Sequence, residues 1–322
     1  MNVLSVSGIY RKDETGFELK NIHFSLQRFQ KLAIAGETGS GKSTLLKIIA
    51  GLAQADSGEV LFEGERVVGP HEKLIPGHKE IAYLSQHFQL RNSYRIEEEL
   101  SYLNKLSDSE AEAIYEVCQI DHLLKRWTTQ VSGGERQRIA LARLLVSSPK
   151  LLLLDEPFSN LDLIHKNILK SVIHDIGEKL GITCMLVSHD AIDVLSWADK
   201  IIVMKNGEII EQGSPQKIYQ TPGSEYVAGL FGKYNLLPVH LFKDNISLNG
   251  KRIFLRPEQL QITKEAENAE ATITAIRFAG SYNEIDLSLP ENTITVLSPA
   301  QNSFKVGDAV KVSLGDTSLW YM

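Results

Sequence analysis

The chain has 322 residues, of which 43 % are hydrophobic and 23 % are charged. This composition is typical of globular proteins and excludes disordered, collagen-like and fibrous classes. The 40 acidic residues against 34 lysines and arginines give a net charge of −6, which argues against a general nucleic-acid binder. Its 2 cysteines are too few for a disulfide framework and favour a reducing compartment. We expect a cytoplasmic protein, since no stretch approaches the roughly 20 apolar residues of a spanning helix and residues 1–10 lack a signal-peptide pattern.

Short apolar runs alternate with helical patterns up to about Lys233. The runs at residues 31–35, 81–85, 151–154 and 184–187 read as strands, and the last three are apolar enough to be buried. The segments 44–51, 136–146 and 164–179 read as helices. Such an alternation is typical of an α/β fold with a mostly parallel sheet. The pair Asn206-Gly207 between two strand-like runs predicts an antiparallel hairpin over residues 200–213.

Beyond Asn235 the helical periodicity disappears. Residues 283–290 and 310–314 alternate apolar and polar side chains, and residues 271–278 and 293–297 are rich in β-branched residues. About five short strands in a segment of this size predict a small β-barrel or sandwich. We therefore place a domain boundary near Asn235.

The segment 36–43 reads GETGSGKS and matches the phosphate-binding pattern G-x-x-x-x-G-K-[S/T], between an expected strand and an expected helix. Glycines let backbone N–H groups surround phosphate oxygens, and the helix N-terminus adds the positive end of a dipole. Lys42 is expected to contact the β- and γ-phosphates and the Ser43 hydroxyl to ligate Mg²⁺. The nucleotide-binding residues predicted here are Gly36, Glu37, Thr38, Gly39, Ser40, Gly41, Lys42, Ser43 and Thr44.

Two acidic residues, Asp155 and Glu156, follow the four leucines at 151–154. Open α/β sheets bind ligands at the carboxyl ends of their strands. Asp155 is therefore expected to help Ser43 hold Mg²⁺, and Glu156 to polarise the attacking water. On its own this pair would be an ordinary solvated turn. With the phosphate loop it indicates a P-loop nucleotidase, which leaves kinases, GTPases and helicases open.

The segment 131–138, VSGGERQR, separates these classes. It resembles the LSGGQ signature of the ATP-binding subunits of ABC transporters, with Val131 in place of Leu and Glu135 in place of Gln. Ser132, Gly133 and Gly134 at a helix N-terminus offer a hydroxyl and uncovered N–H groups to an anion. The resemblance implies that they contact ATP held by a second subunit, in a head-to-tail homodimer or with a second ATPase subunit.

Other segments resemble further motifs of this family. Gln86 resembles the Q-loop glutamine that senses the metal, and Asp162 resembles the D-loop aspartate that faces the other subunit. His189 resembles the H-loop histidine that contacts the γ-phosphate. Tyr10 resembles the aromatic residue that stacks on adenine, with Phe17 as the weaker candidate. The resemblance thus implies Glu156, His189 and Gln86 as catalytic residues and Ser43, Gln86 and Asp155 as metal ligands.

The resemblance also implies an architecture. It predicts an α/β P-loop NTPase domain of the ABC type over residues 1–234, with a mostly parallel sheet, an antiparallel β subdomain and a helical subdomain at about 87–131. A small all-β OB-like domain follows at residues 235–322. Its segment FLRPEQL at 254–260 resembles the transport-associated domain of importer ATPases for sugars, polyamines, ferric iron or oxyanions.

The function implied is an ATPase motor that uses ATP and Mg²⁺ and works as a dimer on membrane permease subunits. A solute-binding protein, an indirect partner, delivers the solute to that permease. Such a motor lies on the inner face of the cell membrane and contacts no nucleic acid. Two alternatives stay open from the sequence: a soluble ABC ATPase acting on nucleic acid or a scaffold, and the motor of an exporter.

Overall fold

The computed structural model describes residues 2–86, 89–159, 161–238, 252–264, 269–290, 292–315 and 319–322. Compactness divides the chain into two units, Met1–Pro215 and Gln216–Met322. The domain boundary predicted near Asn235 lies further along the chain. The boundary near Asn235 stays a prediction, because it marks where the fold type changes, whereas the division at Pro215 marks where the chain separates into compact units.

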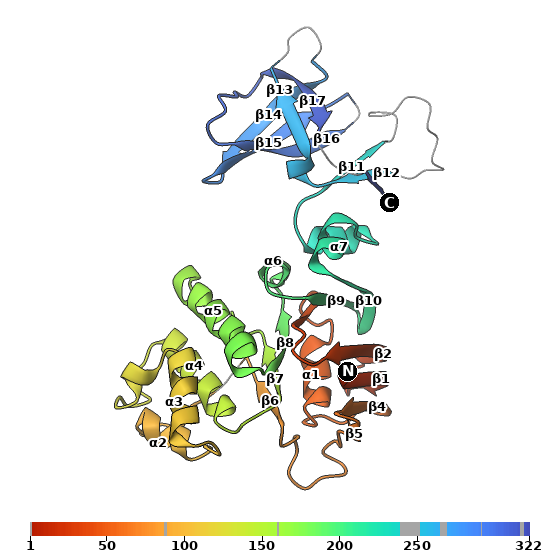
Figure 1. Ribbon diagram of the computed structural model, residues 1–322. Coiled ribbons are helices and arrows are strands. Elements are labelled where there is room, and N and C mark those ends of the chain that lie inside the picture. Colours follow the sequence, from red (N-terminus) through yellow and green to blue (C-terminus); the bar gives the residue numbers. More distant parts are fainter. Residues whose placement is uncertain are drawn as a thin grey trace. The chain divides into compact units, whose positions relative to one another are not determined.

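A six-stranded sheet forms the centre of the first unit (Figure 1). Its order is β10 (Glu208–Gly213), β9 (Lys200–Lys205), β3 (Leu32–Ala35), β8 (Thr183–Ser188), β7 (Leu151–Asp155) and β6 (Ile81–Leu84). All neighbours pair in parallel except β10 and β9, which form the predicted hairpin. Asn206 and Gly207 both have positive φ, 49° and 78°, as a two-residue hairpin turn requires. The four predicted strands are thereby confirmed.

A second, antiparallel sheet lies beside the first. Its order is β2 (Glu18–Gln27), β1 (Asn2–Lys12), β4 (Ser57–Phe62) and β5 (Glu65–Arg66). Helix α1 (Lys42–Ile49) lies between the two sheets, and its Leu45 and Ile49 are fully buried in a core shared with strands of both (Figure 1). The helix that begins at Lys42 is therefore packed on both sides, which fixes the position of the loop before it.

Helices α4 (Gly133–Leu145) and α5 (Leu163–Leu180) lie on the other side of the six-stranded sheet (Figure 1). The region between β6 and α4 contains α2 (Ile96–Ser101), α3 (Asp108–Val117) and a 3₁₀ turn (Asp121–Leu123). Beyond the end of α2, the Lys105 N–H donates to the Val146 carbonyl at 2.9 Å, at the end of α4. The short helix α6 (Ala191–Leu195) follows β8. No helix of the described residues is long and apolar enough to cross a bilayer.

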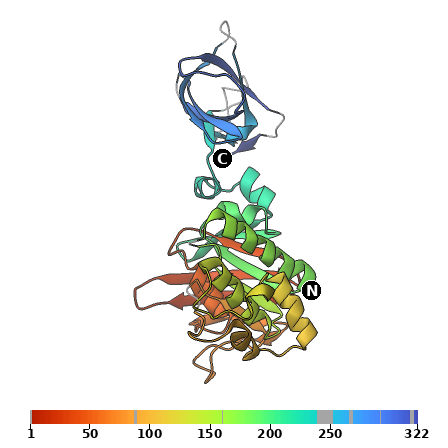
Figure 2. The same ribbon diagram turned by 90° about the vertical axis from the view of Figure 1, so that its left-hand side faces the viewer.

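The second unit begins within α7 (Pro215–Gln220), one residue after its start, and continues with α8 (Glu225–Leu230) and two antiparallel sheets. One has the order β11 (Asn235–Pro238), β12 (Arg252–Leu255), β18 (Trp320–Tyr321). The other has the order β13 (Leu260–Thr263), β17 (Ala309–Leu314), β14 (Ala271–Phe278), β15 (Tyr282–Ser288), β16 (Thr293–Pro299). Both contribute side chains to one core, around which the strands curve (Figure 2). The expected small all-β domain is confirmed.

Arg256, which directly follows β12, has the largest fully buried side chain among the described residues and is only 1 % exposed. Its guanidinium donates to the carbonyls of Tyr219, Ala228, Gly232 and Lys233 at 3.0–3.1 Å. Burial lowers the pKa of this group from its ordinary value. One buried cation thus joins the helical start of the second unit to its β-core.

We predict that Arg256→Met destabilises the second unit by about 2–4 kcal/mol, because the substitution leaves buried carbonyls without donors. Hydrogen–deuterium exchange of the β12–β16 amides should become faster, while the amides of β3 and β7 keep their protection. The control is Arg277→Met, which removes an exposed arginine paired with Glu284 and Asp286. It should change neither the stability of the second unit nor the exchange of these amides. Unchanged exchange in Arg256→Met would show that the network contributes no net stability.

Candidate nucleotide site

The loop between β3 and α1 has a conformation that depends on its glycines. Gly39 and Gly41 have φ of 83° and 99°, in the left-handed region. A Cβ on Gly36 would lie 2.3 Å from the Met204 carbonyl oxygen, so a side chain cannot be placed there. Glu37, Thr38 and Gly39 are exposed, whereas Ser40 is buried. The loop therefore presents backbone to solvent immediately before the N-terminus of α1.

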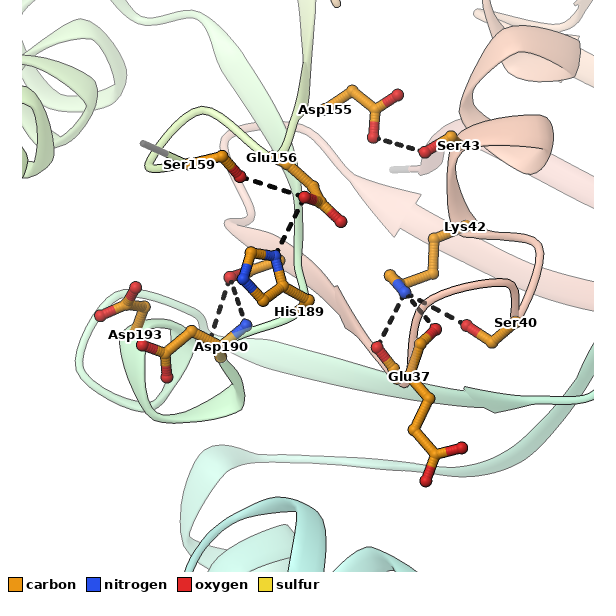
Figure 3. Close-up of polar contacts among 12 residues, drawn as sticks. Glu37, Ser40, Lys42, Ser43, Asp155, Glu156, Ser159, His189, Asp190 and Asp193 are labelled. Carbon is orange, nitrogen blue, oxygen red and sulfur yellow. Dashed lines mark hydrogen bonds and ion pairs between the residues drawn. The ribbon is translucent and has the colours of Figure 1, made fainter. Parts of the chain in front are cut away.

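The Lys42 side chain folds back into this loop. Its ammonium donates to the Gly36 carbonyl (2.8 Å), the Glu37 carbonyl (2.7 Å) and Ser40 Oγ (3.2 Å) (Figure 3). Burial lowers the pKa of Lys42, and the nearby carboxylates of Glu156 and Asp155 oppose that shift. The arrangement keeps a cation beside exposed N–H groups, which is the chemistry that a phosphate group requires.

Ser43 and Asp155 come together although they are far apart in the sequence. The Ser43 hydroxyl donates to Asp155 Oδ1 at 2.8 Å, and the Tyr83 hydroxyl donates to Asp155 Oδ2 at 2.7 Å. Desolvation and the adjacent carboxylate raise the pKa of Tyr83. Sequence reasoning missed Tyr83. Its signal is a hydroxyl-bearing residue within the apolar run 81–84, since a half-buried tyrosine hydroxyl needs a hydrogen-bond partner.

Glu156 follows Asp155 but points elsewhere. Its φ of 50° turns the chain out of the strand, a strained conformation for a residue with a side chain. Glu156 Oε2 accepts from Ser159 Oγ (3.0 Å) and lies 2.9 Å from His189 Nδ1 (Figure 3). These residues line a cavity of about 210 Å³ together with Gln86. The structure thus brings together all three predicted catalytic residues, Glu156, His189 and Gln86.

The signature segment forms the start of α4. Ser132 is the N-cap: its Oγ accepts from the Glu135 N–H (3.2 Å), and the Glu135 carboxylate accepts from the Ser132 N–H (2.7 Å). These hydrogen bonds lower the pKa of Glu135. They account for the glutamate at this position as part of a helix cap. Ser132 and Gly133 are exposed, and the buried Gln137 of the same helix donates to the Pro157 carbonyl, next to Glu156.

Asp162 is the N-cap of α5 and its side chain is 62 % exposed. It accepts from the His165 N–H at 3.0 Å and lies 2.7 Å from His165 Nδ1. The His165 ring also lies against the signature segment, where a Cβ on Gly134 would be 2.5 Å from it. The D-loop and signature positions are therefore neighbours within one chain. The segment that resembles the D-loop is Ser159–Asp162, and its Asn160 lies outside the described residues.

The aromatic ring that packs beside the phosphate loop is Phe17. A Cβ on Gly41 would lie 2.8 Å from Phe17 Cζ. Tyr10, the residue predicted to stack on adenine, lies on β1. The Tyr10 hydroxyl interacts with Glu18 on the neighbouring strand β2: hydrogen bonds from Lys12 and, to a smaller extent, from Tyr10 lower the pKa of Glu18. Adenine stacking by Tyr10 stays a prediction.

Comparison with known proteins agrees with this geometry. A family described as ABC transporter matches residues 19–159, and one described as TOBE domain matches residues 253–322. The sulfate/thiosulfate import ATP-binding protein of Bacillus cereus is 31 % identical, with 88 % of this chain and 85 % of that protein covered. The glucose import ATP-binding protein of Saccharolobus solfataricus is 32 % identical, with 95 % and 92 % covered.

The solved structures that match are also of this type. An ATP-binding cassette of an ABC transporter in its ADP conformation is 26 % identical with a TM-score of 0.61, and covers 72 % of this chain and 98 % of its own. The phosphate loop, the acidic strand end and the signature helix define a P-loop ATPase. The chain belongs to the ABC transporter family, as an ATP-hydrolysing motor subunit of the import type with a TOBE domain. The resemblance seen in the sequence is thereby confirmed.

We predict that Tyr83→Phe lowers the rate of ATP hydrolysis about tenfold and raises the Mg²⁺ concentration needed for half-maximal activity. The substitution removes one charge-assisted hydrogen bond, worth about 1.5–3 kcal/mol, from a buried carboxylate. Tyr102→Phe, which removes an exposed hydroxyl, is the control. A Tyr83→Phe protein with the wild-type Mg²⁺ dependence would show that Tyr83 does not orient Asp155 for metal binding.

Proposed function

We propose that this ABC ATPase powers solute import by binding and hydrolysing Mg-ATP at two shared sites in a dimer. The proposal is supported most by three groups that meet at the carboxyl ends of the parallel strands. Lys42 is a cation held by the loop, and Ser43 and Asp155 form a hydroxyl–carboxylate pair. Glu156 is a second carboxylate, paired with His189. Phosphoryl transfer to water needs these functions together.

Each group has one proposed role. Lys42 and the N–H groups of residues 36–44 bind the phosphates. The oxygens of Ser43, Asp155 and Gln86 suit Mg²⁺, which prefers a few protein oxygens plus substrate phosphates, and the ion would neutralise charge developing on the phosphates. Phosphate oxygens of the bound nucleotide would complete the coordination of this ion. Glu156 takes the proton of the attacking water, and His189 holds that carboxylate in place.

The second half of each site would come from another subunit. Ser132 and Gly133 are exposed at the N-terminus of α4, and Asp162 is exposed on the adjacent turn. A helix N-terminus attracts anions. In a head-to-tail dimer, of two copies or with a second ATPase subunit, this surface would cover the triphosphate bound by the partner.

The permease would contact the helical region between β6 and α4. Tyr94, Tyr102 and Trp127 are exposed there, and the guanidiniums of Arg91 and Arg95 stack on these rings at 4.4–5.5 Å. Tyrosine, tryptophan and arginine are the side chains that most often dominate protein interfaces. The protein would thus act on the cytoplasmic face of the membrane, with a solute-binding protein as an indirect partner. Relatives of similar identity import sulfate or thiosulfate in one case and glucose in the other, which favours solute selection outside this chain.

The first test of the proposal is Glu156→Gln. Glutamine is almost isosteric but cannot accept the proton of the attacking water, and loss of a general base costs about 10²–10⁴ in rate. We expect normal Mg-ATP binding, very slow hydrolysis and an ATP-bound dimer visible by gel filtration. EDTA should weaken that dimer, because the metal neutralises the triphosphate between the subunits. Turnover at the wild-type rate would exclude Glu156 as the catalytic carboxylate.

The second test separates the two halves of the site. Ser132→Arg places a bulky side chain where the partner's phosphate would lie, but far from the phosphate loop in the sequence. We expect ATP affinity of the monomer to stay within about twofold of wild type, while ATP-dependent dimerisation in the Glu156→Gln background is lost. Binding is measured by equilibrium titration and dimerisation by light scattering. If both properties are lost together, the signature segment does not serve a second subunit.

A further inference from the structure

A cluster of ion pairs joins α5 to the segment that carries His189. Lys166 Nζ lies 3.2 Å from Asp190 Oδ2 and also pairs with Asp193, and Lys170 Nζ lies 2.9 Å from Asp193 Oδ1. The Asp193 side chain is 8 % exposed and that of Lys166 is 20 % exposed. None of these four residues is part of the roles proposed above.

The cluster is placed between two functional segments. Lys166 lies one helical turn after Asp162, the N-cap of α5. Asp190 directly follows His189, and Figure 3 shows both residues with Asp193. Asp190 also caps α6 by accepting from the Ile192 N–H at 3.2 Å. Lys166, Asp190 and Asp193 line the same cavity as Glu156 and His189.

The two lysines differ in what they contact. Lys170 pairs with Asp193 and lies 5.7 Å from the Phe158 ring, so it supplies a counter-charge to a buried carboxylate. Lys166 pairs with Asp193 as well, but it also reaches Asp190, next to the histidine. Ser188 Oγ exchanges hydrogen bonds with the Asp190 backbone at 3.0 and 3.1 Å, so the short segment around His189 is held at Asp190. Moving Asp190 would therefore move the His189 ring relative to Glu156.

We propose that Lys166 is a positioning residue for ATP hydrolysis: it holds Asp190, and through it His189, at the distance from Glu156 that the reaction needs. Because Lys166 is one turn from Asp162, it also connects the surface proposed to meet the other subunit with the histidine at the γ-phosphate. The proposal rests on the roles proposed for Glu156 and His189.

The test compares three lysines of the same helix. Lys166→Met keeps the aliphatic stem and removes the charge. We expect kcat to fall about tenfold, the cost of a small misplacement in an active site, with KM for ATP within twofold because the phosphate loop is untouched. Lys166→Arg should restore most of the rate. Lys170→Met should lower the melting temperature but keep kcat, and Lys179→Met, in an exposed pair with Asp175, should change neither.

A double-mutant cycle with His189→Ala separates positioning from a general structural role. If Lys166 acts through His189, adding Lys166→Met to His189→Ala should cause less than a twofold further loss, measured by release of labelled phosphate. An equal loss in both backgrounds, an unchanged kcat in Lys166→Met, or an equal fall of kcat in Lys170→Met would each overturn the proposal. Full activity of His189→Ala and Glu156→Gln would instead remove the proposed function itself, and the role of Lys166 with it.

Discussion

The parallel pairing of β3 with β8 and of β8 with β7 determines where the chemistry of the first unit can occur. Ala35 is opposite Ser188, and Asp155 is opposite Val187. These three strands are buried along their whole length, so a change of register would expose apolar side chains and is disfavoured. The carboxyl ends of β3, β8 and β7 therefore lie side by side, and the residues that follow these strands must meet there.

At that edge two adjacent carboxylates have different surroundings. Asp155 still belongs to β7 and is satisfied by hydroxyls of Ser43 and Tyr83. Glu156 is turned away by its left-handed backbone and is satisfied by Ser159 and His189. Two like charges side by side would repel each other if they shared one environment. Their separate surroundings suit different roles, in which Asp155 would bind a cation and Glu156 would accept a proton.

Much of the fold and of the site could be predicted from the sequence, because the signals are local. The leucine run 151–154, the glycine-rich loop and the Asn206-Gly207 turn each encode their structure within a few residues. Contacts between distant segments could not be predicted in this way. Tyr83 meets Asp155, and Arg256 reaches the Ala228 carbonyl of α8, only because of tertiary packing. The hydrogen bond from the Lys105 N–H to the Val146 carbonyl is a further contact of this kind.

Buried charged side chains connect separate helices and strands in both units. In the helical region Glu99 is fully buried, with Arg91 at 2.7 Å and Arg143 of α4 at 3.2 Å. Such groups contribute little net stability compared with apolar side chains, but removing one partner is costly, so they fix how elements lie relative to one another. Helix α4 is held in this way to Glu99 through Arg143 and to the Pro157 carbonyl through Gln137. A shift of the helical region against the sheet must therefore stretch one of these contacts or move the chain beside Glu156. If Glu156 is the catalytic carboxylate, as proposed, these contacts would couple the proposed permease surface to ATP hydrolysis.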